Sequence, residues 1–141
     1  MGENAQFSLD VKAFVEATKR DMLEVTKKAV IDVSNRVVDM SPVDTGRFRS
    51  NWEIGQDVVP DSAQPEMGPY PRGPEVKARL ASQAGAITRD VRFIFLANTL
   101  PYAYRLEMEG WSKQAPAGML RVVVPEFQTY LDKAAQEVKN R

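Results

Sequence analysis

The 141-residue chain contains neither cysteine nor histidine. Without cysteine it can form no disulfide and no thiolate metal site. Without histidine it lacks the side chain that most often serves as a general base, as a metal ligand and as a switch near neutral pH. We therefore expect no enzymatic activity, no metal site and no cofactor.

An excess of charge of one sign is also missing, because 19 lysines and arginines balance 19 aspartates and glutamates. This balance argues against a chain built mainly to neutralise nucleic-acid phosphates or to lie on an anionic membrane. No apolar run approaches the ~18 residues that span a bilayer. The first ten residues, MGENAQFSLD, lack the features of a signal peptide, and Gln6 stands where a myristoylation signal has Ser or Thr. We expect no membrane partner, and a protein made and kept in the cytoplasm or in an assembly built there.

The length fits a single domain over residues 1–141, and its first third has the pattern of a long helix. Ser8 is a suitable N-cap residue, and apolar side chains then recur every three or four positions as far as Met40. A continuous helix of this length measures about 45–50 Å, whereas a domain of this size has a radius of gyration of about 14–15 Å. We expect part of the apolar face to project or to pack against another copy of the chain. The alternative is a helix that lies across a sheet.

The long helix is predicted to end at Ser41-Pro42, because proline removes a backbone donor and disfavours helical backbone in the residue before it. A structural turn should follow, made by Pro42, Asp44, Thr45 and Gly46, with the glycine at positive φ. Strict alternation then predicts a strand over Arg47–Ile54. Its inward side chains would be Phe48, Ser50, Trp52 and Ile54, and its outward side chains Arg47, Arg49, Asn51 and Glu53.

Residues 55–74 hold five of the nine prolines, which leaves little room for helix or strand. A loop of about twenty residues is uncommon in a small domain and is usually functional or disordered. We expect a flexible loop or arm that becomes ordered on meeting a partner, in preference to a lid over an active site.

The other predicted elements are a helix over Glu75–Ala84, a central strand over Val91–Asn98, a two-turn helix over Tyr102–Glu109 ended by Gly110, and a last helix from Pro125. Residues 119–124 fit either a strand or a helix. The chain is therefore predicted to be α+β. A long N-terminal helix and a C-terminal helix would pack on a small antiparallel sheet, with a long proline-rich loop.

Asp44-Thr45-Gly46 also spells the motif of aspartic proteases, in which two carboxylates share one proton and a dimer can supply the second carboxylate. That chemistry needs the aspartate at the end of a strand. Here a long helix and a proline precede it, and Arg47 follows the glycine. The turn interpretation is favoured, and a dimeric aspartic protease is the enzymatic alternative.

Two segments of the sequence are similar to segments of a known protein family. The first is Ser41-Pro42-Val43-Asp44-Thr45-Gly46-Arg47, followed by Asn51-Trp52; the second is Leu100-Pro101-Tyr102-Ala103-Tyr104-Arg105-Leu106-Glu107, followed by Gly110-Trp111-Ser112. Together they resemble the neck or tail-completion proteins of long-tailed bacteriophages. In that family a long first helix leads to the Pro-Val-Asp-Thr-Gly turn, and a strand, a long loop, a second strand, the Tyr-Ala element and a closing helix follow. The resemblance covers this order over nearly the whole chain.

The resemblance implies a structural virion protein that forms a ring, expected to be a hexamer, at the head–tail junction. Its partners would be copies of itself, the head-connector protein and the tail-tube or terminator protein, and DNA would pass through the ring without sequence-specific binding. The protein would lie in the host cytoplasm before assembly and in the neck of the virion afterwards. Subunit contacts are expected at Arg47, Arg49, Tyr70 and Trp111. A tail terminator or minor tail protein, and a host-side adaptor that binds one partner as a monomer, remain alternatives.

Overall fold

The computed structural model describes residues 2–61 and 68–141 and has the expected α+β class. Its elements in chain order are α1 (Gly2–Met40), the 3₁₀ helix η1 (Arg49–Asn51), β1 (Glu53–Gln56), α2 (Gly73–Gly85), β2 (Ile94–Ala97), α3 (Ala103–Met108), α4 (Leu120–Val123), the 3₁₀ helix η2 (Val124–Glu126) and α5 (Phe127–Lys139). The two strands form an antiparallel sheet in which Ile54 lies opposite Leu96. Among the described helices, none has both the length and the apolar composition needed to cross a membrane.

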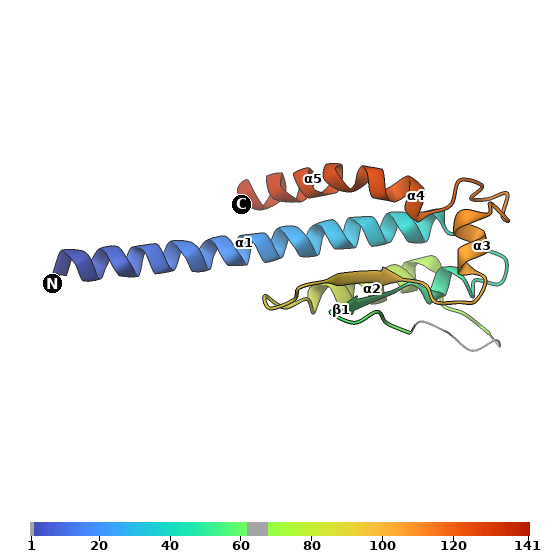
Figure 1. The fold of residues 1–141 in the computed structure, drawn as a ribbon, viewed down its shortest axis with the longest axis horizontal. Helices are drawn as coiled ribbons and strands as arrows, with labels where there is room; N and C mark the ends of the chain where they lie inside the picture. The colour runs from blue at the N-terminus through green and yellow to red at the C-terminus, as the bar shows by residue number, and fades with distance from the viewer. Residues whose placement is uncertain (1, 62–67) are drawn as a thin grey trace.

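Helix α1 forms the middle layer of the molecule (Figure 1). Helix α5 runs antiparallel along one side of its C-terminal half, and α2 with the two strands lies on the other side. Ion pairs join this C-terminal part of the chain to α1, among them Lys28 with Glu137 of α5 at 3.3 Å, and Arg36 with Glu126, the last residue of η2, at 3.2 Å. The C-terminal helix thus packs chiefly on the long helix.

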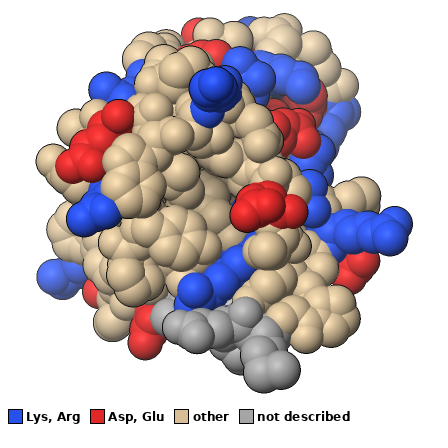
Figure 2. Space-filling model, turned by 90° about the vertical axis from the view of Figure 1, so that its right-hand side faces the viewer, with Lys and Arg blue, Asp and Glu red and all other residues tan. Residues whose placement is uncertain are grey.

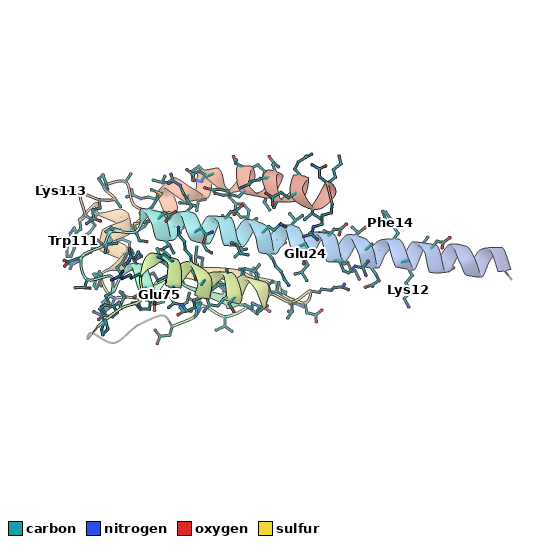
Figure 3. The ribbon with its side chains drawn as sticks, turned by 180° about the vertical axis from the view of Figure 1, so that it is seen from behind. Lys12, Phe14, Glu24, Glu75, Trp111 and Lys113 are labelled. Atoms are coloured by element: carbon teal, nitrogen blue, oxygen red, sulfur yellow. The ribbon has the colours of Figure 1, made fainter. Side chains whose placement is uncertain are left out.

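The N-terminal part of α1 extends beyond every other element (Figure 1), and Phe14 and Lys12 on it point away from the rest of the molecule (Figure 3). The side chain of Phe14 is 72% exposed and that of Met22 is 64% exposed. The predicted projection of the apolar face is confirmed. The predicted start is wrong, because α1 begins at Gly2 and Ser8 lies inside it. No proline between these two residues stops the helix from extending.

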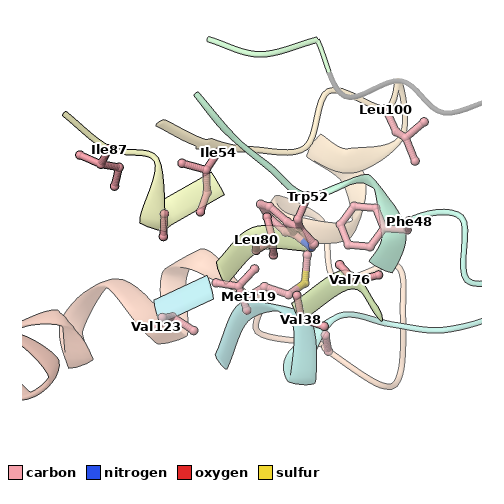
Figure 4. Close-up of a cluster of buried hydrophobic side chains, with 13 residues drawn as sticks. Val38, Phe48, Trp52, Ile54, Val76, Leu80, Ile87, Leu100, Met119 and Val123 are labelled. Carbon is pink, nitrogen blue, oxygen red and sulfur yellow. The ribbon is translucent and has the colours of Figure 1, made fainter. Parts of the chain in front are cut away.

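The core lies where α1, α2 and the segment after α1 meet (Figure 4). Val37 and Val38 of α1 belong to one buried cluster with Val76, Leu80 and Ala84, which recur at every fourth position on one face of α2. The other buried members are Phe48, Trp52, Ile54, Ile87, Leu100, Ala115, Met119 and Val123. One continuous cluster therefore holds the turn, the sheet and the region around α3 and α4 against the long helix.

The end of α1 is tied to the turn that follows. The helix stops at Met40, as predicted. The hydroxyl of Ser41 donates to the carbonyl of Val37 (2.8 Å) and accepts from the indole N–H of Trp52 (2.8 Å). The chain reverses at Gly46, whose φ is 94°, as the turn prediction requires. Trp52 thus closes the turn by bonding the residue that ends the helix.

The strand after the turn begins later than predicted. The N–H of Ser50 donates to the carbonyl of Gly46 (3.0 Å), and the N–H of Asn51 donates to the carbonyl of Phe48 (3.0 Å), so this stretch forms η1 and the strand starts only at Glu53. The predicted inward side chains are buried: Phe48, Ser50, Trp52 and Ile54. Asn51, expected to face outward, is buried as well, because a 3₁₀ turn does not alternate in steps of two.

The second strand is shorter than predicted, and the expectation that it is central is wrong. In the described part of the chain it pairs with β1 alone. The other candidate strand, residues 119–124, forms α4 and the start of η2, so none of the described residues supplies a third strand to cover its second edge. Phe93, just before β2, is 63% exposed.

The proline-rich loop is shorter than its predicted span of residues 55–74. Gly55 and Gln56 belong to β1, and Gly73 and Pro74 begin α2, since proline fits the first turn of a helix. Residues 62–67 of the expected arm lie outside the described residues.

Candidate interaction surface

The two sequence segments that carry the resemblance meet at the end of the molecule opposite the projecting part of α1 (Figures 1 and 3). They line a groove of about 310 Å³, with residues 42–48 on one side and Tyr102, Leu106, Trp111, Ser112 and Gln114 on the other. We call residues 42–48 together with residues 102–114 the turn end. Figure 2 looks onto this end and shows acidic and basic side chains interspersed with uncharged ones, without a patch of one sign.

A glutamine joins the two sides of the groove. The side-chain oxygen of Gln114 accepts from the N–H of Val43 (3.0 Å), and its side-chain nitrogen donates to the carbonyl of Val43 (3.1 Å). The hydroxyl of Ser112 accepts from the N–H of Gln114 (3.1 Å) and so orders the loop that presents it. Sequence reasoning missed this contact, because one glutamine in a loop forms no periodic or local pattern.

Aromatic rings support the groove from below. The ring centroid of Phe48 lies 5.8 Å from that of Trp52, nearly edge-on, and 6.2 Å from that of Tyr102. The guanidinium of Arg47 lies 5.9 Å from the Tyr102 centroid. Burial raises the pKa of the Tyr102 hydroxyl, and the nearby Arg47 charge opposes that shift only in part. The floor is thus apolar and neutral, with a cation beside it.

Trp111 is the most exposed large apolar side chain of the groove, at 56%. Gly110 precedes it with φ at 62°, and a Cβ added there would lie 2.8 Å from the carbonyl oxygen of Pro116. The guanidinium of Arg105 stacks 4.4 Å above the Trp111 ring. Tryptophan and arginine are the side chains most enriched among the residues that dominate protein–protein binding.

The structure brings all four predicted contact residues to this end. Arg47 and Trp111 line the groove itself. Tyr70 and Arg49 lie behind Gly46, at 3.7 Å and 3.9 Å from the position of a Cβ added to that glycine. Arg49 also lines a neighbouring hollow of about 470 Å³. Contact of these residues with another molecule stays a prediction.

Glu107 has a structural role that the sequence did not reveal. One of its carboxylate oxygens accepts from the N–H groups of Met119 (2.6 Å) and Leu120 (3.1 Å), and the other accepts from the N–H of Arg121 (2.7 Å). These N–H groups open α4 and have no partner inside that helix. A Cβ at Gly118, where φ is 82°, would lie 2.5 Å from the Glu107 carbonyl oxygen, so the approach requires glycine. The donors are too distant in sequence to form a recognisable capping motif.

Asp44 is exposed, and it lies between helix α1 and the 3₁₀ helix η1 instead of at the end of a strand. Asp44 therefore lacks the strand-end position that the aspartate of the Asp-Thr-Gly motif has in aspartic proteases.

Among the described side chains, no group of three or more His, Cys, Asp or Glu could hold a metal ion.

Comparisons of the chain with protein-family models, with curated proteins and with solved structures found no match.

Proposed function

We propose that the protein is a structural subunit of the head–tail junction of a long-tailed bacteriophage, a neck or tail-completion protein that assembles into a ring. The observation that carries the proposal is the turn end. The two segments on which the resemblance rests are far apart in the sequence, yet they line one groove and are joined by the bonds between Gln114 and Val43.

The distribution of apolar side chains supports an assembling subunit. Phe14 is 72% exposed on the projecting part of α1, and Trp111 is 56% exposed at the opposite end. Exposed apolar surface at two separated places suits a protein that meets different neighbours at its two ends. Heterologous contacts of that kind give a ring when the rotation between neighbours closes.

The proposal is tested by deleting the reading frame from the phage genome that carries it. We expect filled heads and separate tails, and joined, infectious particles when the intact protein is supplied from a plasmid. Joined particles formed normally without the protein would overturn the proposal. Tails of irregular length would favour the tail-terminator alternative, because a terminator stops growth of the tail tube.

The turn end is tested in the same complementation experiment with Trp111→Ala. The variant should fold normally, because Trp111 is more than half exposed, but it should lower the yield of joined particles. Lys113→Ala is the matched control, since Lys113 is exposed close by and does not line the groove (Figure 3). Equal yields from the two variants would remove the turn end from the proposal.

A further inference from the structure

The projecting part of α1 carries a narrow apolar face. Val11, Phe14, Val15, Thr18 and Met22 follow one another at steps of three, one, three and four residues, which places them on one side of a helix. The hydroxyl of Thr18 donates to the carbonyl of Phe14 (2.9 Å), so its polar group is satisfied within the helix. We call these five side chains the stripe.

The same line of α1 continues as the floor of an open groove. Thr26, Ala29 and Val33 belong to a groove of about 320 Å³ whose walls include Leu96 of β2 and Phe127 of α5. Thr26 also bonds back into its own helix, through a 2.9 Å bond from its hydroxyl to the carbonyl of Met22. The ring of Phe127 is 42% exposed at the mouth. We call this the α5 groove.

One copy of the chain cannot bring its own stripe and groove together. The stripe and the floor of the groove lie one after the other on a single continuous helix, Gly2–Met40, so they cannot face each other within one copy (Figure 1). The stripe is about 17 Å long at 1.5 Å per residue, or about three turns, and the groove floor from Thr26 to Val33 covers about two turns. The groove floor is thus about one turn shorter than the stripe, so it can hold about two turns of that apolar helix face, as in helix-in-groove recognition.

Charge does not oppose such a contact between copies. Residues 10–21 of the projecting part carry three acids and three bases: Asp10, Glu16 and Asp21 with Lys12, Lys19 and Arg20. The whole chain has a formal net charge of 0. Neither the projecting part nor the whole chain therefore carries a net charge that would repel a second copy.

We propose that the stripe of one copy docks in the α5 groove of a second copy. Each copy then gives a stripe to one neighbour and a groove to the other, and this heterologous contact would link subunits of the ring, a part of the inference that rests on the proposed function. Pairing of two stripes with each other is the weaker arrangement. It would cover each stripe with a single helix only, and it would leave the apolar lining of both grooves open.

The test uses two variants of the full chain, Phe14→Glu in the stripe and Phe127→Glu in the groove, with the mass measured by sedimentation over a range of concentrations. We expect the unmodified protein to associate and each variant alone to stay monomeric. An equimolar mixture should form dimers and nothing larger, because one intact stripe then meets one intact groove. Ala13→Glu and Thr129→Glu are matched controls on exposed positions outside the stripe and the groove lining, and both should associate normally.

A cysteine pair gives a second measurement that adds no charge to the groove. The chain contains no cysteine, so a copy with Phe14→Cys and a copy with Phe127→Cys can link only to each other or to themselves. With oxidised glutathione, the mixture should give a heterodimer in high yield, and Ala13→Cys with Phe127→Cys should not.

Three results would overturn the inference: an unmodified chain that stays monomeric at every concentration, normal association of Phe14→Glu or Phe127→Glu, or no dimer and no cross-link in the mixtures. Association of Phe127→Glu alone, with none of Phe14→Glu, would favour pairing of two stripes, and the absence of any dimer in the mixture would favour a different partner. Rings unaffected by Phe14→Glu would reject this contact and leave the proposed function standing. A confirmed contact in a protein whose deletion leaves phage particles intact would reject the proposed function alone.

Discussion

Gly46 shows what the turn after α1 demands of a single residue. Its φ of 94° lies where side chains with a Cβ are strained, although space itself is sufficient, since the nearest atom to an added Cβ is 3.7 Å away. We expect Gly46→Ala to lower the free energy of unfolding by about 1–2 kcal/mol, from backbone strain alone.

Gly85 provides the control for that prediction. It ends α2 without positive φ, and nothing lies within 4 Å of an added Cβ. Gly85→Ala should therefore be neutral or stabilise the protein by about 0.5–1 kcal/mol, through the reduced freedom of the unfolded chain. Urea denaturation measures the free energy of unfolding of both variants. An equal loss in Gly46→Ala and Gly85→Ala would contradict the backbone strain assigned to position 46.

Asp57, which follows β1, makes the stability of the protein depend on pH. One of its carboxylate oxygens accepts from the N–H groups of Phe93 (2.9 Å) and Arg92 (2.8 Å). These bonds, that of Phe93 first, hold the pKa of Asp57 below its ordinary value of 3.8. Because the folded state favours the carboxylate, its contribution to stability is full above the ordinary pKa and is lost as the pH falls through the lowered one.

The measurement compares thermal unfolding of the unmodified protein with that of Asp57→Asn over a pH series. Asn tolerates the positive φ of 62° at this position but carries no charge. The unmodified protein should be the more stable near neutral pH, and the difference should shrink at acid pH. Other carboxylates with a lowered pKa, such as Glu16 and Glu126, are present in both proteins, so their contributions to the pH dependence cancel in the stability difference. A stability difference between the two proteins that stays constant down to acid pH would exclude this role of the Asp57 carboxylate.

At the scale of elements, the start of α4 depends on a residue in another helix. Glu107 of α3 accepts three backbone N–H bonds from residues 119–121. Glu107→Ala should destabilise the protein by about 1–2 kcal/mol, the usual cost of a lost helix cap. Glu109→Ala, two residues further on and exposed, should change stability little. Denaturation of both variants measures the effect, and similar midpoints would show that other groups satisfy these donors.

The elements that sequence predicted well are those set by local residues. Pro42 ends α1, Gly46 and Gly110 supply positive φ, and the helix predicted over Glu75–Ala84 is present as α2. Each of these effects acts within a few residues of its cause. They were enough to establish the fold class.

What sequence could not predict depends on contacts between distant residues. Alternation from Arg47 to Ile54 indicated one strand, but η1 forms there. Arg79 of α2 donates to the carbonyl of Ser50 within η1 and to that of Trp52 just after it. The groove at the turn end depends likewise on Gln114, which bonds a backbone many residues earlier. Four residues were predicted to make subunit contacts, but neither their position together at one end of the molecule nor the bonds that shape that end could be predicted.

At the scale of the whole molecule, α1 decides the shape. Its C-terminal half is enclosed by α5 on one side and by α2 and the sheet on the other, whereas its N-terminal part carries an apolar stripe beyond them (Figure 1). The proposed contacts therefore lie at two distinct places, an apolar one along α1 and a mixed one with cations at the turn end. These two kinds of surface respond differently to salt.

The response of self-association to salt distinguishes them. If the stripe and the α5 groove link the copies, added NaCl should leave the association constant nearly unchanged, because the burial is apolar and the net charge is 0. Ammonium sulfate should strengthen it, since sulfate favours apolar burial. If Arg47 and Arg49 instead held neighbours together through ion pairs, NaCl would weaken association steeply. Sedimentation at several salt concentrations separates the two cases, and a steep fall with NaCl would transfer the link between subunits from α1 to the turn end.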